Sequence, residues 1–226
     1  MNICKLHLYI VALSVLLLMA CTSSKETTTS SNTKSTTSSR SAKSNGIKSF
    51  ESVIKKNAAK DEGVFTVYEQ DGSYFFEIDN SLLGREMLLV SRIAGVPSGY
   101  SGFNSAGSKS AEQVITFSKY KDRILIRKKS YEAIADENLA VYNSVKANNF
   151  EPVIAAFDIE AINEDSTGIV IDVTDLFTKD VEAISGISSY LRKSYQIRRL
   201  DTDRSLIETV KSFPENIEVR QVMTYV

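Results

Sequence analysis

Residues 63–93 constrain the fold of this chain most, because they hold its clearest turn signal between two strand-like runs. Residues 64–68 (VFTVY) and 73–78 (SYFFEI) are rich in the β-branched and aromatic residues that favour strands. Asp71-Gly72 lies between them. An Asp-Gly pair suits a type I′ turn, since both of its central residues need a positive φ. The stretch therefore predicts a β-hairpin.

The second half of this stretch predicts two further elements. Residues 81–84 (SLLG) suggest one short helical or turn element that Gly84 closes. Residues 87–93 (MLLVSRI) are almost continuously apolar, which predicts a third strand covered on both faces.

The rest of the chain continues a β-rich pattern. Further strands are predicted over residues 112–120, 123–131, 152–161, 169–173 and 217–226, with a weaker strand pattern at 195–200. Helical patterns are shorter: one covers 175–184, one follows a cap at Asp203 or Ser205, and 140–150 fits either a strand or a helix. The expected fold class is α+β, with mostly antiparallel sheets and a few short helices after a disordered N-terminal tether.

Residues 46–61 predict an amphipathic helix. Their apolar side chains recur at spacings of three and four, which places them on one helical face: Ile47, Phe50, Val53, Ile54 and Ala58. We expect this face to pack on the sheet, with a helix lying on a membrane surface as the alternative.

The first 45 residues predict export and anchoring. A weakly basic start is followed by the apolar run 8–19, which is shorter than the roughly 20 residues that span a bilayer, so residues 1–20 predict a signal peptide. Leu18-Met19-Ala20-Cys21 matches a bacterial lipobox, which predicts acylation of Cys21. An ordinary secretory signal with a chance cysteine is the alternative.

Residues 21–45 predict a disordered linker. Sixteen of the 24 residues from 22 to 45 are Ser or Thr, a composition that cannot bury enough apolar surface to offset the entropy of ordering. Beyond it we expect a small unit of helix and strands at 46–93 and a β-rich domain at 94–226. The strand pattern at 217–226 runs to the last residue, from which we expect an open sheet edge and a truncated domain in a longer protein.

Cysteine and histidine usage excludes several kinds of active site. Cys4 and Cys21 are the two cysteines and His7 is the one histidine, so all three lie in the first 21 residues. Once the signal peptide is removed, the chain has no residue set for a Ser-His-Asp triad, a Cys-His dyad or a histidine-bearing zinc site. The net charge of −1 gives no field that favours nucleic acid.

Two short motifs resemble catalytic or phosphate-binding patterns but fail in context. Residues 102–110 (GFNSAGSKS) nearly form a P-loop, but Ser108 separates the second glycine from the lysine and a strand pattern follows instead of a helix. A surface loop is expected there. Ser52-Val53-Ile54-Lys55 matches Ser-x-x-Lys, yet the companion motifs of penicillin-recognising enzymes are absent, so we reject this reading.

Two groups of charged residues are candidate binding sites. The acidic residues around two predicted strands could bind Ca²⁺ or serve glycoside hydrolysis, but their spacing fits no calcium loop and structural roles are expected: Asp158, Glu160, Asp172, Asp175 and Asp180. The densest basic run is expected to be a solvated face or a contact to another domain: Arg192, Lys193, Arg198 and Arg199.

Four stretches resemble a family of large bacterial envelope zinc-dependent metalloproteases. They are residues 76–92 (FEIDNSLLGREMLLVSR), 149–157 (NFEPVIAAF), 171–177 (IDVTDLF) and 212–219 (SFPENIEV). The resemblance covers roughly residues 50–226 and corresponds to the region that precedes the catalytic domain in that family. The family's catalytic domain carries a His-Glu-x-x-His zinc helix, and this chain has no such motif.

The resemblance implies a non-catalytic accessory region of a lipid-anchored metalloprotease. Its expected partners are a membrane, through Cys21, and a downstream protease domain, with no nucleic acid. Zinc is expected only in that protease domain, and the chain alone is expected to be inactive. The expected location is the bacterial cell envelope, at the outer membrane or periplasmic face. A stand-alone envelope binding module is the alternative, and an autonomous enzyme that uses carboxylates and lysines is a third possibility.

Overall fold

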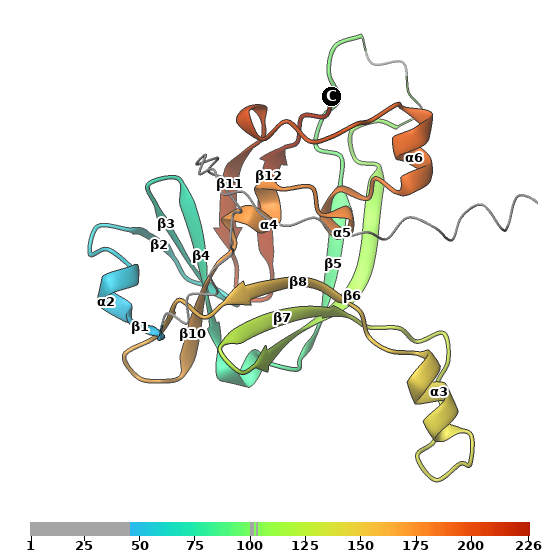
Figure 1. Ribbon diagram of the computed structural model, residues 1–226. Coiled ribbons are helices and arrows are strands. Elements are labelled where there is room, and N and C mark those ends of the chain that lie inside the picture. Colours follow the sequence, from blue (N-terminus) through green and yellow to red (C-terminus); the bar gives the residue numbers. More distant parts are fainter. Residues whose placement is uncertain (1–45, 100–101, 103) are drawn as a thin grey trace, which may run out of the picture. The chain divides into compact units, whose positions relative to one another are not determined.

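A computed structural model describes residues 46–99, 102 and 104–226, which belong to one compact unit. The predicted signal peptide, the linker, His7 and Cys21 lie outside these residues. The fold is α+β and β-rich, with a few short helices (Figure 1). None of the helices in the described part is long and apolar enough to cross a membrane.

The largest sheet has six strands in the order β1-β9-β10-β4-β3-β2. The strands are β1 (Lys48–Ser49), β2 (Ala59–Asp61), β3 (Thr66–Gln70), β4 (Ser73–Asp79), β9 (Ala161–Ile162) and β10 (Gly168–Asp172). Within the described residues, β1 and β9 form the one parallel pair of this sheet. The remaining pairs are antiparallel, as the sequence predicts.

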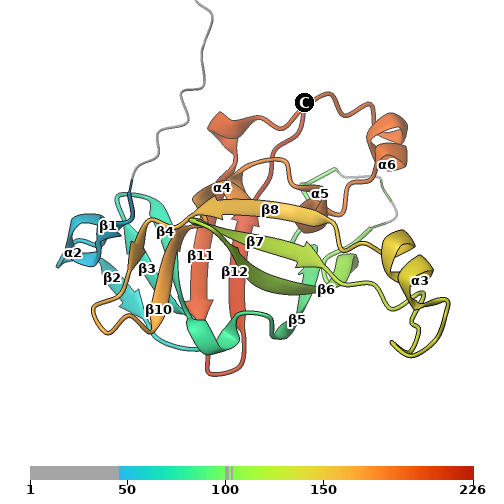
Figure 2. The same ribbon diagram turned by 60° about the horizontal axis from the view of Figure 1, so that its bottom comes forward.

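A second, four-stranded antiparallel sheet has the order β5-β6-β7-β8, and β11 and β12 form a separate antiparallel hairpin. The strands are β5 (Glu86–Arg92), β6 (Lys109–Tyr120), β7 (Arg123–Lys128), β8 (Val153–Asp158), β11 (Leu206–Ser212) and β12 (Ile217–Val222). Figures 1 and 2 show the hairpin beside β5, with β7 and β8 crossing at one end.

The helices of the described residues are all short. They are α2 (Phe50–Val53), α3 (Tyr142–Asn148), α4 (Thr174–Thr178), α5 (Glu182–Ser185) and α6 (Ser189–Ser194), with 3-10 turns η1 (Asn80–Leu82) and η2 (Thr202–Arg204). The pattern at 140–150, which fitted a strand or a helix, is therefore helical in α3.

The predicted hairpin at 64–78 is confirmed in detail. Gln70 pairs with Ser73, and the turn residues Asp71 and Gly72 have φ values of 51° and 78°. Both are positive, as a type I′ turn requires. The short element that follows is also present as η1, and Gly84 has a φ of 81°.

Side chains of β4 point alternately to the two faces of the six-stranded sheet and contribute to a hydrophobic core on each face. Phe76 and Ile78 point into the main core, which also contains Phe117 and Ile124 from the second sheet. Phe75 points to the other face, where a smaller cluster holds Ile54, Tyr68 and Val170. Because successive side chains of a strand face opposite ways, one run of aromatic residues can fill both cores.

Phe65 joins the two larger sheets at the centre of the main core. Its ring lies 5.6 Å from that of Phe76 in the first sheet and 5.3 Å from that of Phe117 in the second, the latter edge-on at 87°. Edge-to-face pairs at such distances add to the stabilisation from burial alone.

The lack of a side chain at Gly63 allows the β11–β12 hairpin to pack closely against the chain that leads into the first sheet. Ser212 Oγ donates to the carbonyl of Phe65 over 2.6 Å, and Val64 N–H donates to the carbonyl of Phe213 over 2.7 Å. A Cβ on Gly63 would lie 2.5 Å from that same Phe213 oxygen, so the close approach depends on glycine.

Two predicted helices are corrected by the structure. Residues 46–61 form a single helical turn, α2, because Lys48–Ser49 pairs with β9 and Ala59–Asp61 pairs with β3. Ile54 is buried against Tyr68 and Phe75, and Phe50, Val53 and Ala58 pack on the same cluster, so most of the predicted apolar face does pack on the sheet. Ile47, the remaining predicted member, is 42% exposed.

The helix predicted after Asp203 or Ser205 is the strand β11. The hydroxyl of Ser205 donates to the carbonyl of Asp201 over 2.6 Å and accepts the N–H of Thr224 over 3.0 Å, so it ties two chain segments together instead of capping a helix. Pairing with β12 then overrides the helical pattern. The weak strand pattern at 195–200 is reduced to one bridge between Leu200 and Tyr225.

The strand at 87–93 exists as β5, but the prediction that both of its faces are covered is wrong. Exposure alternates along β5, and Leu88 and Val90 are 64% and 38% exposed. β5 lies at the edge of its sheet, and its inner residues Met87 and Leu89 pack against the main core. Its apolar outer face is a surface feature rather than core.

Candidate functional site

A large concave feature of the described residues is a groove between β5 and β12. Its volume is about 1850 Å³, above the roughly 300–1000 Å³ of typical small-molecule pockets. One wall is residues 85–95, which include β5. The other is residues 214–225, which include β12, together with Glu208, Thr209 and Lys211 of the neighbouring strand β11. Below, we call it the β5–β12 groove.

The lining shows that the groove runs along strand edges. Successive side chains of a strand point to opposite faces, so a pocket against one face would touch every second residue. This groove instead touches every residue from Glu86 to Ile93 and from Ile217 to Tyr225. Both strands are terminal in their sheets, so among the described residues neither has a strand paired on this side.

The floor of the groove is the main core itself. Phe65, Phe76, Ile115, Phe117 and Phe177 all line it, and each is 8% exposed or less. Inner residues of both walls pack on the same core, including Leu89 and Val219. The core therefore opens between two unpaired strand edges.

A small polar cluster lies beside the groove and shares one lining residue with it, Tyr225. Arg192 from α6 makes an ion pair with Asp180 over 2.6 Å, and Tyr225 Oη donates to the same carboxylate over 3.3 Å. The hydrogen bond to Asp180 raises the pKa of Arg192, and burial raises the pKa of Tyr225. The cluster ties α6 to the last residues of the chain.

One polar atom in the groove wall has no partner. Gln221 Oε1 is buried and has no hydrogen-bond donor among the described residues, while Gln221 Nε2 contacts Met223 Sδ at 3.4 Å. A buried acceptor without a donor costs on the order of 1–3 kcal/mol. The wall formed by β12 therefore has a buried hydrogen-bond acceptor that the described residues leave without a donor.

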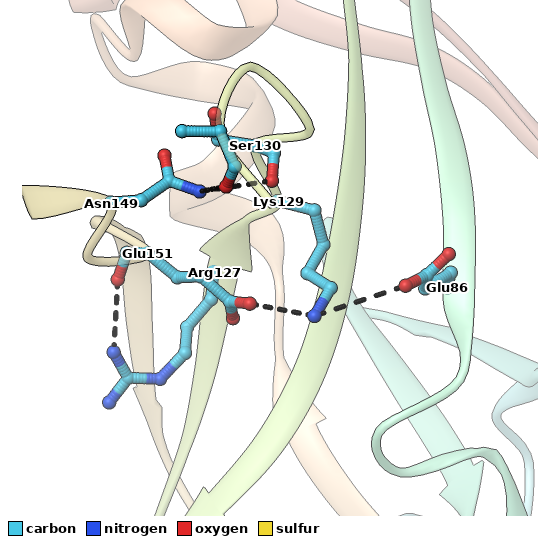
Figure 3. Close-up of polar contacts among 7 residues, drawn as sticks. Glu86, Arg127, Lys129, Ser130, Asn149 and Glu151 are labelled. Atoms are coloured by element: carbon cyan, nitrogen blue, oxygen red, sulfur yellow. Dashed lines mark hydrogen bonds and ion pairs between the residues drawn. The ribbon is translucent and has the colours of Figure 1, made fainter. Parts of the chain in front are cut away.

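A second surface feature is the arm formed by residues 129–152, which contains α3 and projects from the second sheet (Figure 1). It exposes several large apolar side chains, with Ile134 at 76% and Phe150 at 73%. In Figure 3, Lys129 lies between Glu151, at 2.6 Å, and Glu86 of β5, at 3.9 Å. These charges fix the base of the arm next to the groove wall.

The backbone of Glu151 also holds the base of the arm. Its carbonyl accepts a hydrogen bond from Arg127 over 3.1 Å, and Asn149 Nδ2 donates to the carbonyls of Ser130 and Ala133 over 3.4 and 3.0 Å (Figure 3). The hydrogen bond that Lys129 Nζ donates to the Glu151 carboxylate raises the pKa of Lys129.

The acidic residues of the candidate calcium or glycosidase site lie apart in the structure. Asp158 pairs with Arg123 over 3.1 Å and Glu160 with Lys48 over 2.7 Å, whereas Asp180 is in the polar cluster described above. The carboxylate of Asp172 accepts the N–H of Thr174, and Asp175 pairs with Lys179. No group of three or more metal-ligating side chains gathers within the described ranges.

The basic run is also divided. Arg192 is held by Asp180, whereas the backbone N–H groups of Arg198 and Arg199 donate to the carbonyl of Val226. This run therefore helps to fasten the last residues of the chain.

The two rejected motifs have structural partners. Ser52 Oγ donates to the carbonyl of Ser49 over 2.7 Å, while Lys55 pairs with Asp71 at the hairpin turn, so the two side chains bind different groups. In the P-loop-like segment, Lys109 begins β6 and pairs with Glu112 over 2.7 Å. A strand follows this segment, as predicted, where a P-loop would have a helix.

The β5–β12 groove was not predicted from the sequence. The open edge expected at residues 217–226 is the nearest signal, and it concerned one wall. The other wall was assigned to a strand covered on both faces. Which strands end up at sheet edges depends on pairings between residues far apart in the chain, and no local pattern carries that information.

Comparisons with known proteins give two family matches and no named relative. One family of unknown function, DUF5118, matches residues 47–96. A search of curated proteins and a search of solved structures each found no match. A second family of unknown function, DUF5117, matches residues 107–226, which is more than half of the chain. The division predicted near residue 93 falls close to the interval between the two matches and stays a prediction. The chain belongs to the DUF5117 family.

Proposed function

We propose that this chain is a non-catalytic accessory region of a lipid-anchored, zinc-dependent metalloprotease of the bacterial envelope. The observation that carries the proposal is the open core: aromatic residues of the main core line a large groove between two strand edges that no other described strand pairs with. A surface of this kind suits permanent contact with another folded body, since an interface core resembles a domain core cut in half. Residues 76–92 and three later stretches resemble a metalloprotease family, so we propose that the other folded body is a protease domain.

In this proposal the chain contributes position and support, and the protease domain contributes the chemistry. Acylated Cys21 holds the assembly at a membrane, and the Ser/Thr-rich linker spaces the folded unit from it. The folded unit packs against the protease domain through the β5–β12 groove. Zinc belongs to the protease domain, which lies outside these 226 residues.

The arm at residues 129–152 favours a second candidate, a stand-alone binding module. Exposed apolar side chains on a projecting element are typical of protein contact sites, and Ile134 and Phe150 are the most exposed of them. Such a module would bind a separate envelope protein with no protease domain of its own.

Peptidase activity separates the two candidates. The native protein would be extracted from the envelope in detergent and assayed on a casein substrate with and without a zinc chelator. The accessory-region proposal predicts hydrolysis that the chelator abolishes and zinc restores, and no hydrolysis by the purified 226-residue chain with added zinc. Native protein without any hydrolysis would favour the binding module, and hydrolysis by the purified chain would refute both.

A further inference from the structure

The β5–β12 groove has the chemistry of a strand-binding site. We infer that it takes one extended polypeptide segment, which hydrogen bonds to the free edge of β5 and lies against β12. This inference rests on the proposed function, because it names the part of the protease domain that the groove holds. The argument uses the strand edges, the floor and the charges of the lining.

The edge of β5 specifies a polypeptide backbone as its occupant. β5 is seven residues long and terminal in its sheet, so it presents a row of N–H and C=O groups that an added strand can pair with. Strand addition to an open edge is a common mode of peptide recognition, with affinity from the main chain and specificity from alternate side chains.

The direction of the walls sets the direction of the segment. β5 and β12 run in the same direction along the groove (Figure 1). A segment between them is therefore either parallel to both strands or antiparallel to both. Antiparallel pairing is slightly more stable per residue than parallel pairing. We therefore assign the segment an antiparallel orientation to β5.

The floor specifies apolar side chains at every second position. Inward-facing residues of the segment would lie between Leu89 of β5 and Val219 of β12, above the buried rings of Phe65 and Phe117. Because side chains alternate along a strand, the other residues would face outward beside Leu88 and Val90. A segment with apolar residues at alternate positions matches this surface.

The charges of the lining favour a neutral segment. Five basic and four acidic side chains line the groove, and several are already paired, including Arg220 with Glu208 over 2.6 Å and Lys109 with Glu112. A polyanion or a strongly charged peptide would find no complementary field. Gln221 Oε1 is buried in this wall and finds no donor in the described part of the chain. The N–H of an inserted segment can satisfy it after the amide rotates.

Amide hydrogen exchange in the native envelope protein tests this inference. If a segment is inserted, the N–H groups of β5 that face the groove exchange at least roughly 100-fold slower than those of an open edge strand, which exchange close to freely. Free exchange at these positions would overturn the inference. Protection that falls on dilution would also overturn it, because the occupant would then be a second copy of this chain.

Matched substitutions locate the segment. Leu89→Lys and Val219→Lys place a charge beside the floor and are expected to remove the protection of β5, whereas Leu206→Lys on β11 and Val153→Lys on β8 change exposed positions outside the groove lining and are expected to keep it. Continued protection of β6 and β7 amides shows that a variant is folded. Protection that survives both floor substitutions in a folded protein would contradict insertion.

Different experimental results would contradict the inserted strand and the proposed protease. Chelator-sensitive hydrolysis with free exchange along β5 would keep the protease and remove the inserted strand. Protection along β5 in native protein without hydrolysis would remove the protease as the source of the strand, and with it the inference in the form stated.

Discussion

At the scale of single residues, Lys129 joins the arm to the wall of the β5–β12 groove. Its Nζ lies 2.6 Å from Glu151 and 3.9 Å from Glu86, and its side chain is 27% exposed. We predict that Lys129→Met lowers the free energy of unfolding by about 1 kcal/mol, since the partner carboxylates are partly solvated. Lys128→Met, at the exposed neighbouring position, is expected to change it little. Urea unfolding measures both variants, and equal losses would contradict the role of Lys129.

The same contact has a dependence on pH. Glu151 raises the pKa of Lys129 above its usual value of 10.5. The stabilisation from the raised pKa is therefore fully present below pH 10.5 and is lost as the pH rises through the folded-state pKa. Unfolding curves across this range are expected to converge for the wild type and Lys129→Met. A constant difference between them would show that the charge contributes nothing.

Cys21 carries the prediction of membrane anchoring at the residue scale. Several acyl chains give stable attachment to a bilayer, whereas one chain gives only marginal binding. Cys21→Ala is expected to move the protein from the detergent phase to the aqueous phase in a detergent phase-separation assay. Cys4→Ala lies within the predicted signal peptide and provides the control, which is expected to stay in the detergent phase. Detergent partitioning of Cys21→Ala would exclude lipidation as the anchor.

At the scale of elements, β5 has one face on the core and one face exposed. Leu89 packs on the main core and Leu88 is 64% exposed. We predict that Leu89→Ala lowers the free energy of unfolding by about 2 kcal/mol, at the low end for a core leucine because the site is partly open. Leu88→Ala is expected to stay within about 0.5 kcal/mol of the wild type. Similar costs at both positions would mean that both faces of β5 are buried.

Elements with a local signal could be predicted from the sequence, and elements set by distant pairing could not. The hairpin turn at Asp71-Gly72 depends on the positive φ of two neighbours, which the residue types reveal directly. The cap-like residues Asp203 and Ser205 precede a strand because β11 pairs with β12 and Ser205 binds the N–H of Thr224. Tertiary pairing outweighed the local preference there, as it did at residues 46–61.

At the scale of the molecule, the open groove explains why the candidate site escaped sequence analysis. Its walls come from two sheets, and its floor from residues as far apart as Phe65 and Phe177. The sequence excludes several chemistries through its lack of histidine and cysteine beyond residue 21. The sequence does not indicate which of the apolar strands lies at the edge of a sheet. The site emerges only when the order of strands is known.

The intact mass of the native protein, extracted from the envelope and measured without proteolysis, tests the central claim most directly. An accessory region of a lipid-anchored metalloprotease predicts a mass several-fold above the 25.0 kDa of this chain, with residues 1–20 absent and acyl chains on Cys21. A mass near 25.0 kDa, less the signal peptide and plus acyl chains, would contradict the claim and leave a lipid-anchored binding module in its place.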